Sequence, residues 1–500
     1  MPTTAVTTRR KEPQSSKVGR PPVSTGKVVI SDLIEVLEEY LDPKEVKAVY
    51  KAYLFGADAH DGQRRRSGEA FISHPLSVAL ILADMRLDSP SISAAILHDV
   101  IEDTPTLREQ LVELFGEDVA LLVDGVSKID QIEFESKEHA EAENFRKMLL
   151  AMAKDIRVIL IKLADRIHNM RTLDSLRSDQ RKRIAQQTFD IYAPIANRLG
   201  MYTWTQELED LSFQFLYPKR YSAIRKEISK RRGNRKRVVD RSRLKIIEEL
   251  EETGINATVV GREKNIYSVY RKMQDRRVPM AEMGDIFAIR IIVNTVDECY
   301  RVLGIIHNLY KPVPGMFKDY IAISKANGYQ SLHTQLFGTF GQSIEVQIRT
   351  TDMHRVAESG VASHWRYKSH GGEAPPQIVA HSWLVDLIET QQESGNPSEF
   401  LEHLKTDLFP DEIYVFTPKG DIKKLPKGAS ALDFAYAVHS DIGNHCIGAK
   451  ISNEAIPLHH VLNNGDHIEV LTARSACPTP LWLHYVVTGK ARASIQNYLK

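Results

Sequence analysis

The residues with the clearest chemical potential lie in the segment ILHDVIEDT, at positions 96–104. Its apolar spacing is typical of a helix, and on a helix residues three or four apart share a face. We therefore expect His98 to lie beside Glu102, and Asp99 beside Asp103. An imidazole and three carboxylates on one stripe are costly unless a positive group lies among them. The pattern therefore indicates a bound divalent metal ion.

Further potential ligands lie on two other segments with helical spacing. His74 is at the start of one, in ISHPLSVA, and Asp165 is on the other, in LADRIHNM, with Asn169 one turn later. Together with His98 and Asp99, they would form a mixed nitrogen and oxygen site. Such a site suits Mn²⁺, Fe²⁺ or Mg²⁺ better than a closed zinc site does. A single His–Asp pair is more often structural, but four candidate ligands favour a metal that activates water and stabilises phosphoryl charge.

A second charged group lies where short strand patterns alternate with helical ones. In GREKNIYSVYRKM, Lys264, Ser268 and Lys272 are spaced four apart, so a helix would present them together to a triphosphate. Asp285 precedes a β-branched run, and Glu345 lies in the alternating strand SIEVQIRT. Two carboxylates on separate elements can hold Mg²⁺ and a nucleophilic hydroxyl for phosphoryl transfer. The alternative is a solvated sheet face.

These sites require several domains, as the length of 500 residues also indicates. We predict a multidomain α+β protein. Its parts are a disordered leader (1–28), an all-α domain (29–200), an α/β domain opened by a basic helical linker (201–370), a helical connector (371–408), a small β-rich domain (409–473) and the start of a further helical domain (474–500). The cations at 219–245 form either a solvated helix face or a surface for polyphosphate or RNA.

Composition excludes several classes of protein. The net charge is +1, so there is no global attraction to nucleic acid or to membranes. No apolar run is long enough to cross a bilayer, and the polar N-terminus does not have the pattern of a signal peptide. The three cysteines lie far apart without zinc-type spacing. We therefore expect a cytoplasmic protein with no membrane contact.

The motifs SHP, LHDVIEDT and LADRIHNMRTL resemble the HD hydrolase domain of the Rel/SpoT family of alarmone enzymes. That family removes the 3′-pyrophosphate of guanosine tetra- and pentaphosphate with Mn²⁺. The resemblance implies that the metal ligands are His74, His98, Asp99 and Asp165. It also implies that Glu102 and Asp103 orient or activate the attacking water, that Arg65 and Arg66 contact phosphate or guanine, and that Asn169 contacts the nucleoside. For the two arginines the alternative is a role in surface solubility.

The motifs GREKNIYSVYRKM, DIFAIR, FKDYIAISKANGYQSLHT and IEVQIRT resemble the family's synthetase domain. That domain moves the β,γ-pyrophosphate of ATP to the 3′-hydroxyl of GDP or GTP. The resemblance implies that Arg262 and Arg290 sandwich adenine, and that Lys264, Ser268 and Lys272 hold the ATP phosphates. It implies that Asp285 binds Mg²⁺ and that Glu345, with Gln347 nearby, is the general base or second metal ligand. It also implies that the acceptor guanine nucleotide is bound by Tyr329, Lys325 and His333.

One position departs from the family pattern. Bifunctional members usually carry Arg-x-Lys-Asp before the tyrosine, whereas this chain has Met316-Phe317-Lys318-Asp319. Lys318 and Asp319 match the bifunctional class, and Lys318 is counted with the substrate-binding residues. Because Met316 removes one cation from the acceptor side, we expect hydrolysis to dominate and synthesis to be weaker.

The segment from IYVFTPKG to GAKI resembles the TGS domain, a small regulatory β-grasp unit. His439 occupies the position of a histidine that contacts uncharged tRNA in ribosome-bound relatives, while the SpoT-type branch, which this sequence resembles more, is linked to acyl carrier protein. The alternative for His439 is a structural turn residue. Two other functions stay open: an HD phosphohydrolase of other nucleotides, or a regulatory module that binds tRNA, ribosome or acyl carrier protein with a silent catalytic half.

Overall fold

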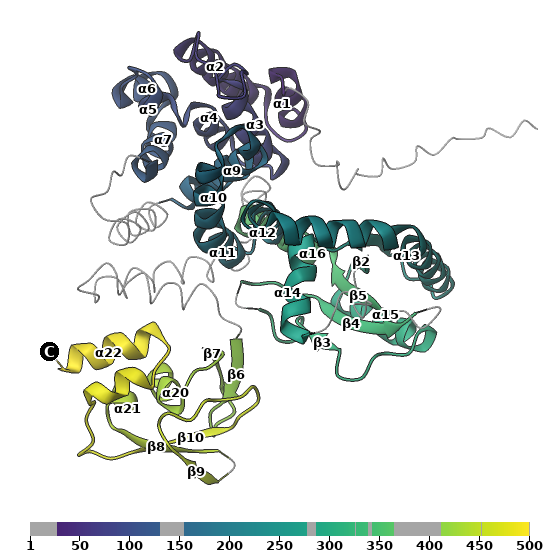
Figure 1. The fold of residues 1–500 in the computed structure, drawn as a ribbon, viewed down its shortest axis with the longest axis vertical. Helices are drawn as coiled ribbons and strands as arrows, with labels where there is room; N and C mark the ends of the chain where they lie inside the picture. Colours follow the sequence, from purple (N-terminus) through teal and green to yellow (C-terminus); the bar gives the residue numbers. More distant parts are fainter. Residues whose placement is uncertain are drawn as a thin grey trace, which may run out of the picture.

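The computed structural model describes residues 28–130, 155–277, 287–325, 327–338, 343–364, 412–451 and 453–499. Residues 1–27 of the predicted leader, the predicted connector at 371–408 and Asp285 lie outside the described residues. Figure 1 shows three units: an N-terminal helical domain, a sheet domain flanked by helices, and a small C-terminal β-rich domain. The predicted fold class of all-α, α/β and small β-rich units is confirmed.

The helical domain is built around α3, α4 and α9, which are largely buried and fill its centre. Its helices are α1 (Ile30–Leu37), α2 (Pro43–Ala59), α3 (Ser73–Asp84), α4 (Ser89–Leu97), α5 (Val100–Asp103), α6 (Arg108–Phe115), α7 (Glu117–Asp130), α9 (Ile156–Arg171), α10 (Ser178–Gln187) and α11 (Ala193–Arg198). Local signals start several of them. Asp88 caps α4 by accepting a hydrogen bond from the Ser91 amide at 3.2 Å, and Pro43 occupies the first position of α2.

The expectation of one continuous helix through ILHDVIEDT is wrong. α4 ends at Leu97 and α5 begins at Val100, with His98 and Asp99 in the turn between them. The Asp99 carbonyl accepts from the amide of Asp103 at 2.9 Å, which starts the short second helix. In a continuous helix adjacent side chains diverge, so this break allows His98 and Asp99 to converge.

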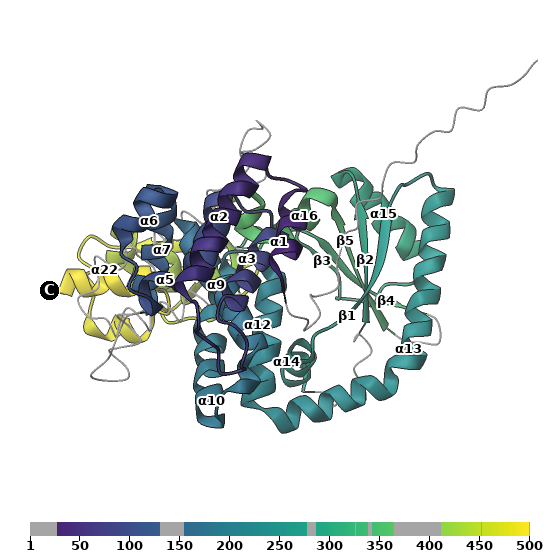
Figure 2. The ribbon, with the colours of Figure 1, turned by 90° about the horizontal axis from the view of Figure 1, so that it is seen from above.

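A single helix, α12 (Tyr202–Leu216), belongs to both of the first two domains. Trp204 and Leu208 lie in the core of the helical domain, whereas Phe213 packs in the core of the sheet domain. The predicted basic helix follows as α13 (Pro218–Glu252), which curves around the outside of the sheet domain in Figure 2 and contacts β1 and β2. The two domains are therefore joined by packing as well as by the chain.

The sheet domain has five strands in the order β1-β2-β5-β4-β3, with β2 and β5 parallel and the other pairs antiparallel. Its elements are β1 (Thr258–Glu263), α14 (Ile266–Arg276), β2 (Phe287–Val293), α15 (Val296–Leu309), β3 (Lys318–Asp319), β4 (Leu332–Phe337), β5 (Ser343–Thr350) and α16 (Thr351–Ser359). The register pairs Arg290 with Gln347, Gln347 with His333, and His333 with Lys318. Four predicted site residues on four strands therefore form one cross-strand row.

The C-terminal unit consists of β6 (Glu412–Phe416), β7 (Ile422–Pro426), α20 (Ala431–Val438), α21 (Ser440–Asn444), β8 (Cys446–Ile451), β9 (Glu454–Ile456), β10 (Ile468–Thr472) and α22 (Gly489–Leu499). Buried Asp433 on α20 accepts hydrogen bonds from the amides of Val487 (3.1 Å) and Thr488 (2.8 Å), which attaches the segment before α22 to the β-rich unit. Among the helices that the structure describes, none is both long enough and apolar enough to cross a membrane.

The contact between the first two domains includes a backbone-to-backbone approach at Gly360. The Val361 amide donates to the Leu199 carbonyl at 3.1 Å, and Asn327 Nδ2 donates to the Asn197 carbonyl at 2.9 Å. Gly360 has a φ of +52°, and a Cβ placed there would lie 2.5 Å from the Leu199 carbonyl oxygen. Glycine is therefore required both by the backbone conformation and by the space available.

We predict that Gly360→Ala destabilises the protein more than Gly328→Ala does. Gly328 also has a positive φ, +75°, but a Cβ there would meet nothing within 4 Å, so it controls for backbone strain alone. The difference in free energy of unfolding should be about 1–3 kcal/mol, measured by urea unfolding of both variants. Equal losses would show that close packing at the junction contributes nothing to stability.

Candidate functional site

In the helical domain the structure brings the four predicted ligands together from two helices, α3 and α9, and the turn between α4 and α5. His74 Nε2 lies 3.1 Å from Asp165 Oδ1 and 3.8 Å from Asp99 Oδ2. His98 Nε2 lies 3.0 Å from Asp99 Oδ1 and 4.0 Å from Asp165 Oδ1. Ligand atoms of His74, His98 and Asp99 all lie within 4.8 Å of one another, so one ion could contact all three.

The hydrogen bonds of His98 fit a metal ligand. Its Nδ1 lies 2.8 Å from the Ala95 carbonyl, an acceptor, so we assign the ring proton to Nδ1. Nε2 is then left with a lone pair, and among the described residues this buried atom has no hydrogen-bond partner, because the approach of Asp99 lacks hydrogen-bond geometry. A ring held through Nδ1 with a bare buried Nε2 is the usual arrangement of a histidine that binds a metal.

Asp165 is held as a carboxylate on the buried side of α9. Burial raises its pKa, but neighbouring positive charge, chiefly the Lys162 ammonium at 3.0 Å, outweighs burial and holds the pKa well below its usual value. Asn169 Nδ2 also donates to Asp165 Oδ1, at 2.5 Å. The carboxylate therefore stays ionised and oriented toward the two imidazoles.

The predicted substrate residues border this cluster with different partners. Arg65, in the loop between α2 and α3, donates from Nη2 to Asn169 Oδ1 at 2.8 Å. Arg66 is exposed and donates to Gln180 on α10 at 2.9 Å. The predicted catalytic acids, Glu102 and Asp103, are exposed on α5.

In the sheet domain, the two predicted phosphate-binding lysines converge on the predicted base. Lys264 Nζ and Lys272 Nζ lie 2.6 Å and 3.0 Å from the same oxygen, Glu345 Oε2. Burial raises the pKa of Glu345, but the two ammonium groups outweigh it and hold the pKa well below its usual value. The expectation of one helix face carrying Lys264, Ser268 and Lys272 is wrong for Lys264, which precedes α14, because β1 and α14 meet at a bend there. Gln347 Nε2 donates to Glu345 Oε1 at 3.2 Å.

The two arginines predicted to enclose adenine are both held by residues near the domain junction. Arg262 donates to Gln206 of α12. Arg290 Nη1 donates to Glu358 Oε1 at 3.0 Å, and Glu358 Oε2 accepts from the Thr203 hydroxyl of α12 at 3.0 Å. Burial and the neighbouring guanidinium of Arg349 lower the pKa of Arg290 to about 10, so it remains charged at neutral pH.

The predicted acceptor residues form an aromatic and basic group at the edge of the same sheet. Tyr329 is largely buried, and its hydroxyl lies 2.8 Å from His333 Nε2. Lys325 Nζ lies 5.5 Å from the Tyr329 ring centroid, and Lys318 is exposed on the neighbouring strand β3. Burial lowers the pKa of His333 to about 3, so this imidazole is neutral and can accept a hydrogen bond from the tyrosine hydroxyl.

The C-terminal candidate, His439, lies between α20 and α21. Its side chain is 64% exposed, and its Nδ1 accepts from the Asp441 amide at 3.1 Å. The ring therefore caps α21 through one nitrogen and exposes its other face.

Three residues in these sites were not among the candidates predicted from the sequence motifs. Lys162 and His168 lie beside Asp165 on α9, and Glu358 joins Arg290 to Arg349. A signal existed for Lys162, since a lone lysine inside the apolar run RVILIKLAD requires a buried partner. Glu358 carried no comparable signal, because its partners are distant in sequence.

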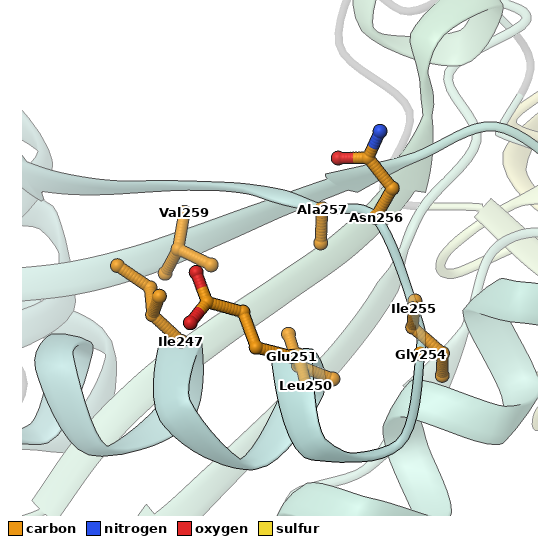
Figure 3. Close-up of a pocket in the computed structure, with 8 residues that line it drawn as sticks. All are labelled: Ile247, Leu250, Glu251, Gly254, Ile255, Asn256, Ala257 and Val259. Carbon is orange, nitrogen blue, oxygen red and sulfur yellow. The ribbon is translucent and has the colours of Figure 1, made fainter. Parts of the chain in front are cut away.

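A separate cavity of about 300 Å³ lies between the end of α13 and the start of β1. Figure 3 shows it lined by apolar side chains, among them Ile247, Leu250 and Val259, together with Glu251 and Asn256. None of its lining residues is a cation, so it does not have the chemistry of a nucleotide site.

Comparison with known proteins identifies the class to which this architecture belongs. Residues 52–202 match the HD domain family, residues 261–372 match the region found in RelA/SpoT proteins, and residues 413–472 match the TGS domain family. The three matches cover the helical, sheet and β-rich units in that order. The chain belongs to the Rel/SpoT family.

Three curated relatives illustrate the range of the family. The chain is 53% identical over 473 residues to the bifunctional (p)ppGpp synthase/hydrolase SpoT of Escherichia coli (strain K12), which covers 94% of this chain and 67% of that protein. It is 47% identical to the GTP pyrophosphokinase of Myxococcus xanthus, over 93% of this chain and 62% of the relative. It is also 47% identical to the guanosine-3′,5′-bis(diphosphate) 3′-pyrophosphohydrolase of Aquifex aeolicus (strain VF5), over 94% of this chain and 66% of the relative. The chain thus spans about two thirds of their length.

The position of Glu345 between two lysines predicts a specific pH dependence of stability. Its pKa in the folded protein is below the ordinary value of 4.5, so its contribution to stability is present above about pH 4.5 and is lost as the pH falls. The stability of the wild type relative to Glu345→Gln should therefore be constant near neutral pH and decline in acid. Urea unfolding of both proteins between pH 7 and pH 3 measures this difference. A difference that grows in acid would contradict the ion pairs.

Proposed function

We propose that the chain hydrolyses guanosine 3′,5′-bis(diphosphate) to GDP and pyrophosphate, and the pentaphosphate to GTP and pyrophosphate, in its helical domain. We propose also that its sheet domain transfers pyrophosphate from ATP to GDP or GTP at a lower rate. The convergence of His74, His98 and Asp99 on one point, with Asp165 beside them, carries the hydrolase proposal. The proposed limits are 29–200 for the hydrolase, 201–370 for the synthetase and 409–473 for the TGS domain.

In the proposed hydrolase mechanism, His74, His98, Asp99 and Asp165 would hold a divalent ion, which we propose to be Mn²⁺. When bound, the ion lowers the pKa of the attacking water and stabilises charge on a phosphoryl oxygen. Glu102 and Asp103, exposed on the adjoining α5, would orient that water and accept its proton.

The leaving pyrophosphate would be received by the loop before α3. Arg65, held by Asn169, offers a guanidinium of fixed orientation, which suits a phosphate oxygen pair. Arg66, whose partner lies on α10, would contact the outer part of the nucleotide, and Asn169 the nucleoside.

In the proposed synthetase, the basic side chains around Glu345 support nucleotide binding. Lys264 and Lys272 lie together at that carboxylate and would contact the ATP phosphates, to which Ser268 on α14 would also donate. Glu345, with Gln347 beside it, would act as general base or ligand to Mg²⁺, and Asp285 would hold that ion.

The two nucleotides would occupy adjacent parts of the sheet domain, because Arg290 and His333 lie in one cross-strand row. Arg262 and Arg290 would enclose adenine, a role supported by their separate anchors to α12 and Glu358. The acceptor nucleotide would lie at the aromatic group, where a ring beside cations suits a guanine phosphate. The residues proposed there are Tyr329, Lys325, His333 and Lys318.

A partner-binding role for the TGS domain is proposed beside these activities. The exposed ring of His439 supports contact with acyl carrier protein, uncharged tRNA or the ribosome. Hydrolysis of other nucleotides by the helical domain is the competing proposal, and a panel of nucleotides would separate it from the preferred one. The cytoplasmic location remains a prediction from sequence.

We predict that two single substitutions separate the activities. Asp99→Ala should lower hydrolysis of guanosine tetraphosphate by at least about 100-fold, while synthesis persists. Loss of a residue that only supports a metal ligand already lowers activity about 10- to 100-fold, and Asp99 is proposed as a ligand itself. Glu345→Gln should abolish synthesis and leave hydrolysis intact. Pyrophosphate release and thin-layer analysis of labelled nucleotides measure the two reactions.

The same assay tests the metal. Removal of divalent ions with a chelator should stop hydrolysis, and Mn²⁺ should restore it. A folded wild type that releases no pyrophosphate with Mn²⁺ would refute the hydrolase proposal. Loss of both activities in Asp99→Ala would show instead that the substitution acts through folding.

We predict that Met316→Arg raises the rate of synthesis. Met316 is 41% exposed in the loop before β3, next to the proposed acceptor residues, so an arginine there adds a cation without a burial cost. The expected gain in kcat/KM for GDP is about two- to fivefold, since an exposed charge contact contributes up to ~1 kcal/mol. Met316→Gln is the neutral control. A gain that persists undiminished in high salt, or that Gln reproduces, would exclude an electrostatic cause.

A further inference from the structure

The two imidazoles of the proposed metal site are supported in different ways. His98 donates from Nδ1 to the Ala95 carbonyl of α4, the helix that precedes it. His74 instead directs Nδ1 at another side chain, the Nδ1 of His168 on α9, at 2.7 Å. His168 is half-buried and comes one turn after Asp165, so α9 supplies both a candidate ligand and the support of a second one.

A hydrogen bond between two ring nitrogens requires the proton to be on one of them only. Arg65 decides which, because its Nη1, always a donor, lies 3.4 Å from the same Nδ1 of His168. That nitrogen is therefore bare and accepts, so the shared proton belongs to Nδ1 of His74. The neutral His74 ring then has its lone pair on Nε2, which faces Asp165 and Asp99.

We propose that His168 is a positioning residue for the hydrolase, which accepts the Nδ1 proton of His74 and so directs the Nε2 lone pair of that ring at the metal. This inference rests on the proposed hydrolase function. His168 would also join the metal site to the substrate, because the same nitrogen accepts from Arg65.

The environment of His168 agrees with this role. The ring is half-buried, and its Nδ1 lies within reach of two donors, the Nδ1 of His74 and the Nη1 of Arg65. Its ring centroid lies 4.8 Å from that of His74 with the planes tilted by 36°, which is close enough for contact without parallel stacking. Partners of this kind, beyond the ligands themselves, change metal affinity by 10- to 100-fold when removed.

Two substitutions at one position test the proposal. His168→Leu removes the hydrogen-bond acceptor and fills the space with an apolar side chain of similar size. His168→Asn instead places an amide oxygen, also an acceptor, where Nδ1 lies. Binding of Mn²⁺ alone, without nucleotide, is followed by the electron paramagnetic resonance signal of free Mn²⁺. Synthesis from ATP and GDP, at the other site, serves as the control for folding.

We expect His168→Leu to weaken Mn²⁺ binding about 10- to 100-fold. His168→Asn should restore most of the affinity, with synthesis unchanged in both variants. Wild-type affinity in His168→Leu would overturn the proposal, and so would equal losses in both variants, which would indicate a packing role. If the wild type binds Mn²⁺ and hydrolyses the alarmone while His168→Leu binds Mn²⁺ equally well, this inference alone fails. A wild type that binds no Mn²⁺ overturns it together with the proposed function.

Discussion

The helical domain depends on the burial of one ionised carboxylate, that of Asp165. A charge inside an apolar helix bundle is costly unless opposite charges and hydrogen bonds surround it. Lys162 and Asn169 each donate a hydrogen bond to one of its two oxygens. Because Asn169 in turn accepts from Arg65, stabilising one carboxylate also fixes a candidate metal ligand and a candidate substrate arginine. The contacts that stabilise the buried carboxylate in the core therefore also position the residues of the candidate site.

The sheet domain gathers basic side chains around two carboxylates. Lys264 and Lys272 both contact Glu345, and Arg290 and Arg349 both contact Glu358. Each carboxylate thus holds two long basic side chains in place through charge-assisted contacts.

Helix α12 links the two domains. Its Trp204 and Leu208 pack in the helical core, and its Phe213 packs in the sheet core. Gln206 and Thr203 on this helix contact Arg262 and Glu358, and Glu358 contacts Arg290. A shift of α12 within the helical core would therefore move the anchors of both arginines, and the close approach of Gly360 to Leu199 keeps the two units in register.

Local patterns in the sequence were sufficient for the classes of element and for the types of chemistry. Helical spacing predicted α9 and the basic helix, alternation predicted β5, and motif residues pointed to a hydrolase and a synthetase of the Rel/SpoT family. These features depend on residues a few positions apart, where the period of a helix or strand determines which side chains share a face.

What only the tertiary structure decided is which of these residues meet. Packing decides that His98 and Asp99 converge at the helix break and that Lys264 and Lys272 meet at Glu345. Strand order decides the row from Arg290 to Lys318. His168 and Glu358 also have partners far away in the sequence. By itself the sequence determined residue types and local periodicity. The hydrogen-bond partners of each side chain, the histidine tautomers and the charges that meet in each site came from the fold, because contacts between distant segments leave no local period.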